Sequence, residues 1–167
     1  MTEALDIPAG YRAIVPGGGF IAHNGPLYAC TEGGALRLAF RVEARHCNPV
    51  GHCHGGMLAT LADMQLALAV LHAQAPSERR FLPTINLALD YLAPSPLGAW
   101  VHGESQLLRS TRNMLFVQGL LHADGVPVLR MSGILKQGPL MSERLPLADT
   151  GAGAGFDPFA AIRDAIK

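Results

Sequence analysis

The sequence predicts an α+β fold, in which a curved antiparallel sheet wraps around one long central helix. Residues 55–72 predict the helix, because they are rich in Ala, Leu, Met and Gln and contain no proline. This segment is apolar on nearly all sides, which is typical of a buried helix. Two strand-like segments precede it and four follow it, and the short turns between successive strands favour antiparallel pairing. The helix is therefore expected to lie against the sheet.

Each predicted strand is a short apolar or alternating segment bounded by turn residues. In the second one, apolar residues alternate with Arg37 and Arg41, as in a strand with one buried and one exposed face. Asp124-Gly125 predicts a tight turn between the last two strands. The predicted strands are residues 27–30, 35–42, 81–92, 100–109, 114–123 and 126–135.

The chain of 167 residues is expected to contain one globular domain, over residues 26–137. Residues 1–25 are expected to be irregular, because this segment contains several prolines and three consecutive glycines. Residues 138–167 are expected to form a loose tail that ends in a short helix, with Asp157-Pro158 at its start.

The charge content limits the classes of partner. Thirteen Lys and Arg residues balance 13 Asp and Glu residues, and only 16% of the chain is charged. Because no basic excess or basic run is present, no nucleic-acid partner is expected. The low charge content suggests that part of the surface is buried between copies of the chain, in a homodimer or a homotetramer.

The apolar run 57–73 is at the lower limit of length for a membrane span. Asp63 lies near its middle and would cost about 2.5–3.5 kcal/mol inside a bilayer, so no membrane partner is expected. The three cysteines cannot all pair within one chain, and residues 1–12 lack the basic start and apolar core of a signal peptide. A reducing, cytoplasmic location is therefore expected.

A motif at the start of the predicted helix carries a resemblance to a known family. The segment from Asn48 to Asp63 matches the pattern N-x-x-G-x-x-H-G-G-x-x-x-x-L-A-D at each stated position. With the segment from Pro83 to Pro94, it resembles the hotdog-fold acyl-CoA thioesterases of the phenylacetyl-CoA thioesterase type. The resemblance covers about residues 20–137.

The resemblance implies that the protein hydrolyses an acyl-CoA thioester to a carboxylic acid and free CoA, with no cofactor and no metal. Asp63 would act as the general base or the nucleophile, and the Gly55 N–H would bind the thioester oxygen. Asn48 and His54 would help to hold the substrate or a water molecule. Thr84 would orient the water.

These residue types suit thioester hydrolysis, which places negative charge on the carbonyl oxygen. A helix N-terminus has unpaired N–H groups and a positive dipole end, and the Gly55-Gly56 pair lets a substrate approach the backbone closely. A preorganised donor of this kind is worth about 2.7–4 kcal/mol. Asp63, the only charged side chain between Arg45 and Glu78, should face a polar cleft, because a lone carboxylate is costly in a sealed apolar core.

Arg109 and Arg112 are candidates for binding the phosphates of coenzyme A, and solvated turn residues are the alternative. Gly55 and Asp63 are eight residues apart, which separates them by about 12 Å along a helix. If both act on one substrate, one chain cannot supply both. Two chains related by a two-fold axis can, which predicts two active sites at a dimer interface.

Two other classes of protein remain open. The same fold also hosts non-catalytic acyl-CoA-binding proteins, because a fold does not determine a function. A metal-binding protein would use His46, Cys47, His52 and Cys53, although their spacing matches no standard zinc site. A cysteine nucleophile would lack an evident base to orient it.

Overall fold

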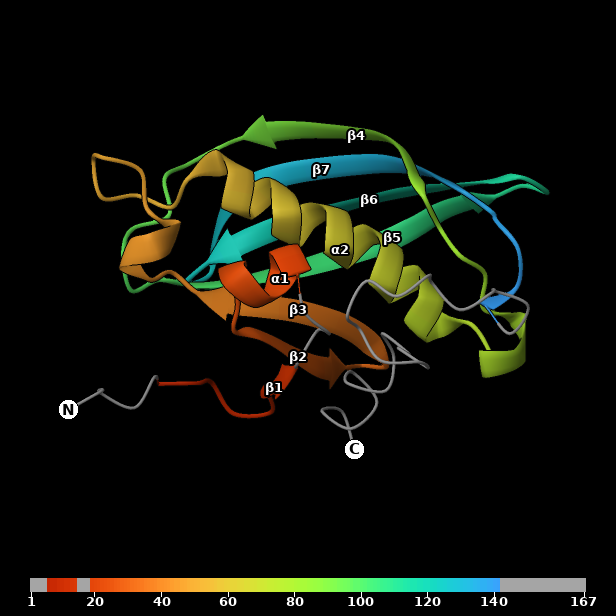
Figure 1. Cartoon of the computed structure of the whole chain (residues 1–167), viewed down its shortest axis with the longest axis horizontal. Coiled ribbons are helices and arrows are strands. Elements are labelled where there is room, and N and C mark those ends of the chain that lie inside the picture. Colours follow the sequence, from red (N-terminus) through yellow and green to blue (C-terminus); the bar gives the residue numbers. More distant parts are fainter. Residues whose placement is uncertain (1–5, 15–18, 142–167) are drawn as a thin grey trace.

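The centre of the computed structural model is an antiparallel sheet that curves around one long helix (Figure 1). The structure describes residues 6–14 and 19–141, and within them seven strands pair in the order β1-β2-β3-β5-β6-β7-β4. The strands are β1 (Arg12–Ile14), β2 (Leu27–Glu32), β3 (Ala35–Arg41), β4 (Thr84–Tyr91), β5 (Trp100–Ser110), β6 (Met114–Ala123) and β7 (Val126–Lys136). The helices are α1 (Gly19–Asn24) and α2 (Gly55–Ala73), with short 3₁₀ turns η1 (Ala44–His46) and η2 (Pro76–Glu78).

The predicted α+β architecture is confirmed, with six predicted strands and the long helix in their predicted order. Strand β4, predicted over residues 81–92, begins later than expected, at Thr84, because Pro83 has no N–H to donate to the neighbouring strand. The prediction that residues 1–25 are irregular is wrong in part, since this segment contains β1 and α1. The helix predicted after Asp157 lies outside the described residues.

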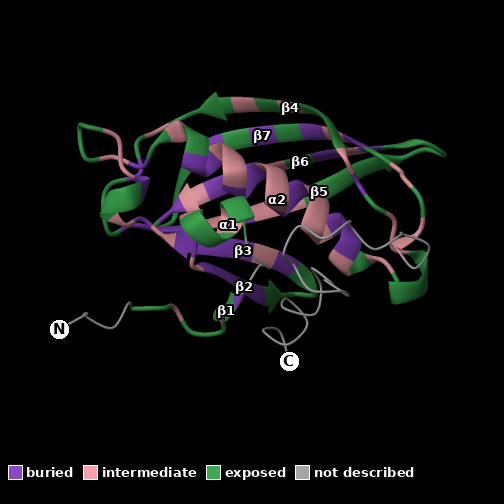
Figure 2. Ribbon diagram, in the orientation of Figure 1, coloured by how far each residue is buried: buried purple, intermediate pink, exposed green. Residues whose placement is uncertain are grey.

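Helix α2 carries the chain from β3, inside the sheet, to β4 at its edge. Leu71 accepts a hydrogen bond from the N–H of Gln74 at the end of the helix, and Pro76 follows. By length and composition α2 could cross a membrane, but it packs against the inner face of the sheet instead (Figures 1 and 2). Its buried apolar residues are Met57, Leu58, Leu61, Ala62, Leu66, Val70 and Leu71.

The core forms where these helix residues pack against the inward side chains of the strands. Figure 2 shows buried segments both on α2 and on the strands beside it. Along β6 and β7, buried residues alternate with exposed or half-buried ones, as the period of two along a strand requires. The fully buried strand residues include Leu36, Leu38, Phe40, Leu115, Leu121, Leu129, Met131 and Leu135.

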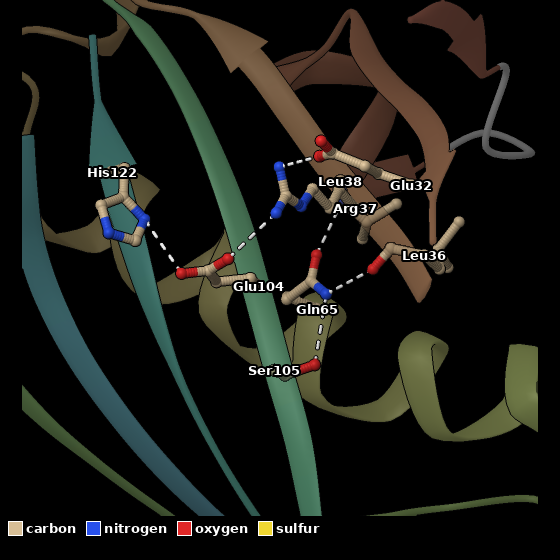
Figure 3. Close-up of polar contacts among 8 residues, drawn as sticks. All are labelled: Glu32, Leu36, Arg37, Leu38, Gln65, Glu104, Ser105 and His122. Atoms are coloured by element: carbon tan, nitrogen blue, oxygen red, sulfur yellow. Dashed lines mark hydrogen bonds and ion pairs between the residues drawn. The ribbon is translucent and has the colours of Figure 1, made fainter. Parts of the chain in front are cut away.

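One buried polar side chain, that of Gln65, connects α2 to the sheet (Figure 3). Strands β3 and β5 pair at only three positions, and Figure 3 shows them diverging beyond these pairs. Gln65 lies in the gap, where its Oε1 accepts the N–H of Leu38 at 2.8 Å and its Nε2 donates to the carbonyl of Leu36 at 2.9 Å. Its Nε2 also lies 3.2 Å from Ser105 Oγ on β5. A helix side chain therefore replaces the missing strand-to-strand hydrogen bonds.

Candidate active site

Asp63 and Thr84 form a direct contact between the helix and the edge strand. Asp63 lies in the middle of α2 and is half-buried, and Thr84 is the first residue of β4. The Thr84 hydroxyl donates to Asp63 Oδ1 at 2.7 Å. The register pairs Thr84 with the buried Leu135 of β7, which places Thr84 on the inner face of the sheet. The fold therefore brings together two residues that were predicted to act in one site.

The first N–H groups of α2 have unequal surroundings. The His54 carbonyl accepts the N–H groups of Met57 at 2.9 Å and Leu58 at 3.4 Å. His54 Nδ1 caps the helix by accepting the N–H of Gly56 at 2.9 Å. Within residues 6–14 and 19–141, the N–H of Gly55 has no hydrogen-bond partner in the protein. Among the first N–H groups of α2, it is therefore the donor that remains available for a ligand.

Tyr91, at the end of β4, covers Gly55. Its hydroxyl donates to the Gly55 carbonyl at 3.0 Å, and a Cβ on Gly55 would lie 3.0–3.2 Å from three atoms of the Tyr91 side chain. The absence of a side chain at Gly55 thus permits the ring to approach. The role of Tyr91 was not predicted, although it lies in the segment that carries the family resemblance, because its contact with Gly55 depends on the path of β4.

The side chains of Asn48 and His54 each use one polar atom in hydrogen bonds within the protein. Asn48 Oδ1 accepts the N–H groups of Val50 and His52, each at 3.1 Å, and so shapes the loop before α2. Gly51 in this loop has a φ of +85°, which only glycine adopts without strain. The helix cap uses His54 Nδ1. Asn48 Nδ2 and His54 Nε2 remain as the polar atoms through which these side chains can contact a ligand.

The other predicted residues do not join this site within one chain. The N–H of Gly56 is engaged by His54. Arg109 and Arg112 are exposed near the β5–β6 turn, which lies at the end of the sheet away from the start of α2 (Figure 1). Gly55 and Asp63 remain about 12 Å apart along α2.

Of the four proposed metal ligands, His46 and Cys53 are buried. His46 is 3% exposed, its Nδ1 accepts the N–H of Glu43 at 3.0 Å, and its Nε2 lies 2.9 Å from the Asn24 carbonyl. Burial lowers the pKa of His46, which favours the neutral ring that these two contacts need. Among the described residues, no three or more His, Cys, Asp or Glu side chains are arranged to hold a metal ion.

A hollow of about 670 Å³ lies on the outer face of the sheet, away from α2. Its lining includes Glu104, Gln118 and Arg130. Near it, Arg37 contacts Glu32 and lies 3.2 Å from Glu104 on the same outer face (Figure 3). This hollow is separated by the sheet from Asp63 and Gly55, so we do not assign it to the candidate site.

The chain is similar in sequence to proteins of the thioesterase superfamily. Residues 50–129 match the sequence model of the thioesterase superfamily. This match confirms the predicted resemblance to the hotdog-fold thioesterases, and the structure has their fold. In sequence, the chain is 27% identical over 132 residues to a Pseudomonas aeruginosa protein provisionally named esterase PA0474, with 78% of this chain and 96% of that protein covered.

Two solved structures extend the comparison. One is a provisionally named thioesterase from Ralstonia eutropha, a phenylacetic acid degradation-related protein, with 27% identity and a TM-score of 0.61 over 70% of this chain and 88% of that one. The other is the BH2602 protein from Bacillus halodurans, solved with CoA, with 21% identity and a TM-score of 0.55 over 60% of this chain and 65% of that one. The second likeness concerns the fold alone.

Proposed function

We propose that the protein is an acyl-CoA thioesterase, which hydrolyses an acyl-CoA to a carboxylic acid and free CoA without a metal or other cofactor. The observation that carries the proposal is the hydrogen bond from Thr84 on β4 to Asp63, the only carboxylate of α2. The CoA bound to the BH2602 protein supports CoA thioesters as the substrate class. We place the enzyme in the cytoplasm.

In the proposed reaction, the N–H of Gly55 binds the carbonyl oxygen of the thioester and stabilises the negative charge that forms there. Asp63 removes a proton from a water molecule that Thr84 orients, and the water oxygen attacks the carbonyl carbon. The carbon–sulfur bond then breaks, and the CoA sulfur takes the proton from Asp63. Direct attack by the Asp63 carboxylate, with later hydrolysis of the anhydride, is the alternative course. Asn48 and His54 hold the substrate or the water.

The proposed site needs a second copy of the chain, because Gly55 and Asp63 of one chain are too far apart to act on one carbonyl group. In the part of the chain that the structure describes, β4 pairs only with β7 and leaves its other edge free. Ile85 on this strand is 55% exposed, and Met64 and Leu68 on α2 are only half-buried. An apolar edge of this kind suits a partner strand and a partner helix.

A two-fold axis beside β4 would place the two α2 helices antiparallel, with Gly55 of each chain near Asp63 of the other. The β5–β6 turn of the second copy would then lie at the end where α2 begins. Arg109, near the end of β5, and Arg112, in that turn, are therefore proposed to bind the phosphates of CoA in the shared site. A tetramer built from two such dimers would keep the same sites.

The test is an assay of thiol release over short, long and aryl acyl-CoA substrates, with wild-type protein and Asp63→Asn side by side. A thioesterase releases CoA, and the variant should lower kcat by at least about 100-fold, the lower end of general-base contributions. A non-catalytic binding protein would bind acyl-CoA in equilibrium dialysis and release no thiol. Turnover by the variant close to that of the wild type would remove Asp63 from the mechanism.

A further inference from the structure

Cys47 and Cys53 face each other across the short loop that precedes α2. Their backbones pair in an isolated antiparallel β-bridge, although neither residue belongs to a strand of the main sheet. On one side of the pair, the N–H of Asn48 donates to the carbonyl of His52 at 2.8 Å. On the other side, the N–H of His54 donates to the carbonyl of His46 at 2.7 Å. The hydrogen bonds thus flank the two cysteines and do not join them.

This pattern defines a non-hydrogen-bonded antiparallel pair, whose Cα atoms lie about 4.5 Å apart with both side chains on one side. Disulfides bridge Cα atoms that are about 4.4–6.8 Å apart. The backbone around Cys47 and Cys53 is therefore already within the range that a disulfide needs. Asn48 Oδ1 and the positive φ of Gly51 hold the loop between them in this shape.

Both thiols are free, and they differ in access to solvent. Cys53 is 6% exposed, and its burial together with the nearby Cys47 raises its pKa to about 12. Cys47 is half-buried, with its Sγ 3.5 Å from the Glu43 carbonyl. A reagent in solution therefore meets Cys47 first, and Cys53 is placed to react with it afterwards. Cys30 lies on β2, outside this loop.

We propose that Cys47 and Cys53 are a redox modification site and form a reversible disulfide within one chain. With oxidised glutathione as the oxidant, the Cys47 thiolate attacks one sulfur, forms a mixed disulfide and releases one glutathione thiolate. The Cys53 thiolate then attacks the Cys47 sulfur and releases the second glutathione. The protein loses two thiol hydrogens, and one oxidised glutathione becomes two reduced ones.

The bond would close the loop that contains Asn48 and ends next to His54 and Gly55. Its formation is independent of the proposed enzyme activity, and the experiment below measures it without a substrate.

The test uses the full-length, folded protein, first reduced and then incubated with oxidised glutathione at mildly alkaline pH. After the remaining thiols are alkylated, trypsin cleavage at Arg45 and Arg79 gives a peptide that contains Cys47 and Cys53 but not Cys30. The proposal expects this peptide to be two hydrogens lighter and unalkylated, and dithiothreitol should reverse the change. Cys30→Ser is the matched control and should behave in the same way.

Two further variants and one condition make the test strict. Cys47→Ser and Cys53→Ser should each prevent the loss of two hydrogens in this peptide. Because the fold holds the pair in place, the effective concentration of the two thiols in folded protein should exceed that in urea by about tenfold or more. Stable glutathione adducts on Cys47, thiols that stay open to alkylation, or a bond that forms only in urea would each overturn the proposal.

Discussion

Gln65 on α2 occupies the space that a side chain on Gly103 of β5 would need. A Cβ on Gly103 would lie 2.8 Å from Gln65 Cγ and 3.0 Å from Gln65 Oε1. Contacts below 3.0 Å force a neighbour to move, and Gln65 is fixed by its bonds to Leu36 and Leu38. The lack of a side chain at Gly103 therefore permits the helix to bridge β3 and β5.

Gly103→Ala should lower the free energy of unfolding by about 1–3 kcal/mol, the usual range for overpacking in a core. Urea unfolding of the purified protein measures this loss. The matched experiment introduces the same change into Gln65→Ala, where the shortened side chain removes the two contacts with Gln65 and leaves Leu121 Cδ2 at 3.0 Å from the new methyl group. The loss from Gly103→Ala should then be smaller. Equal losses in both backgrounds would show that the two residues do not compete for space.

The contribution of the Thr84 hydroxyl to catalysis can be tested separately from the contribution of the side chain's shape. Thr84→Val keeps the branched side chain but cannot donate to Asp63, whereas Thr84→Ser keeps the hydroxyl. We expect Thr84→Val to lower kcat by about tenfold or more, since an oriented general base is worth about 10²–10⁴ in rate. Thr84→Ser should retain most of the activity in the thiol-release assay. If both variants behave alike, the hydroxyl has no part in the reaction.

The shared site makes a prediction about mixtures of inactive variants. Gly55→Pro removes the proposed N–H donor at the first position of α2, where proline fits the backbone. Gly55→Ala is its control, because it adds a Cβ against Tyr91 but keeps the N–H. When Gly55→Pro and Asp63→Asn proteins exchange subunits at random, each heterodimer holds one intact site. The mixture should recover about a quarter of wild-type activity.

Light scattering should first show that the wild-type protein is at least a dimer, and mass spectrometry should confirm subunit exchange. A mixture that exchanges but keeps only the activity of its parents would place the whole site within one chain. A greater activity of Gly55→Ala than of Gly55→Pro would assign the loss to the missing donor and not to crowding of Tyr91.

His46 should make the protein less stable in acid. Its pKa is lowered by burial, while in the unfolded chain it titrates near 6.5. Below pH 6.5 the unfolded chain binds a proton that the folded protein does not, so the contribution is complete above that pH and is lost as pH falls through the lowered pKa.

Urea unfolding between pH 5 and 7 measures this dependence, and His46→Gln should make it shallower. His72 and His102 also have pKa values lowered by burial, so the variant keeps part of the slope. A slope that His46→Gln leaves unchanged would contradict the assignment.

Those helices and strands were predictable from the sequence whose apolar residues repeat with a regular period over many positions. Helix α2 and strands β2 to β7 each contain enough apolar residues to show their period, whereas β1 has three residues and shows none. The roles of Asp63 and Thr84 in one site were expected from a family resemblance and not from any pattern along the chain, and their direct hydrogen bond was not predicted.

Other contacts between elements far apart in the chain were not predictable from local sequence. Gln65 is a single polar residue on a helix, and its three partners lie on strands 27, 29 and 40 residues away in the chain. The same holds for Tyr91 and Gly55, which are 36 residues apart and meet only because β4 runs beside α2. Such contacts follow from the assembled fold, and local propensity carries no information about them.

The hydrogen bond from the N–H of Leu38 to Gln65 also allows two kinds of motion to be measured separately by hydrogen exchange. Most amide hydrogens in a sheet are shielded by a neighbouring strand and exchange with solvent deuterium when that strand opens. The amide hydrogen of Leu38 is shielded by a side chain of α2 instead. Its exchange therefore reports the departure of the helix from the sheet, while the amides of the paired residues beyond it on β3 report the opening of the sheet itself.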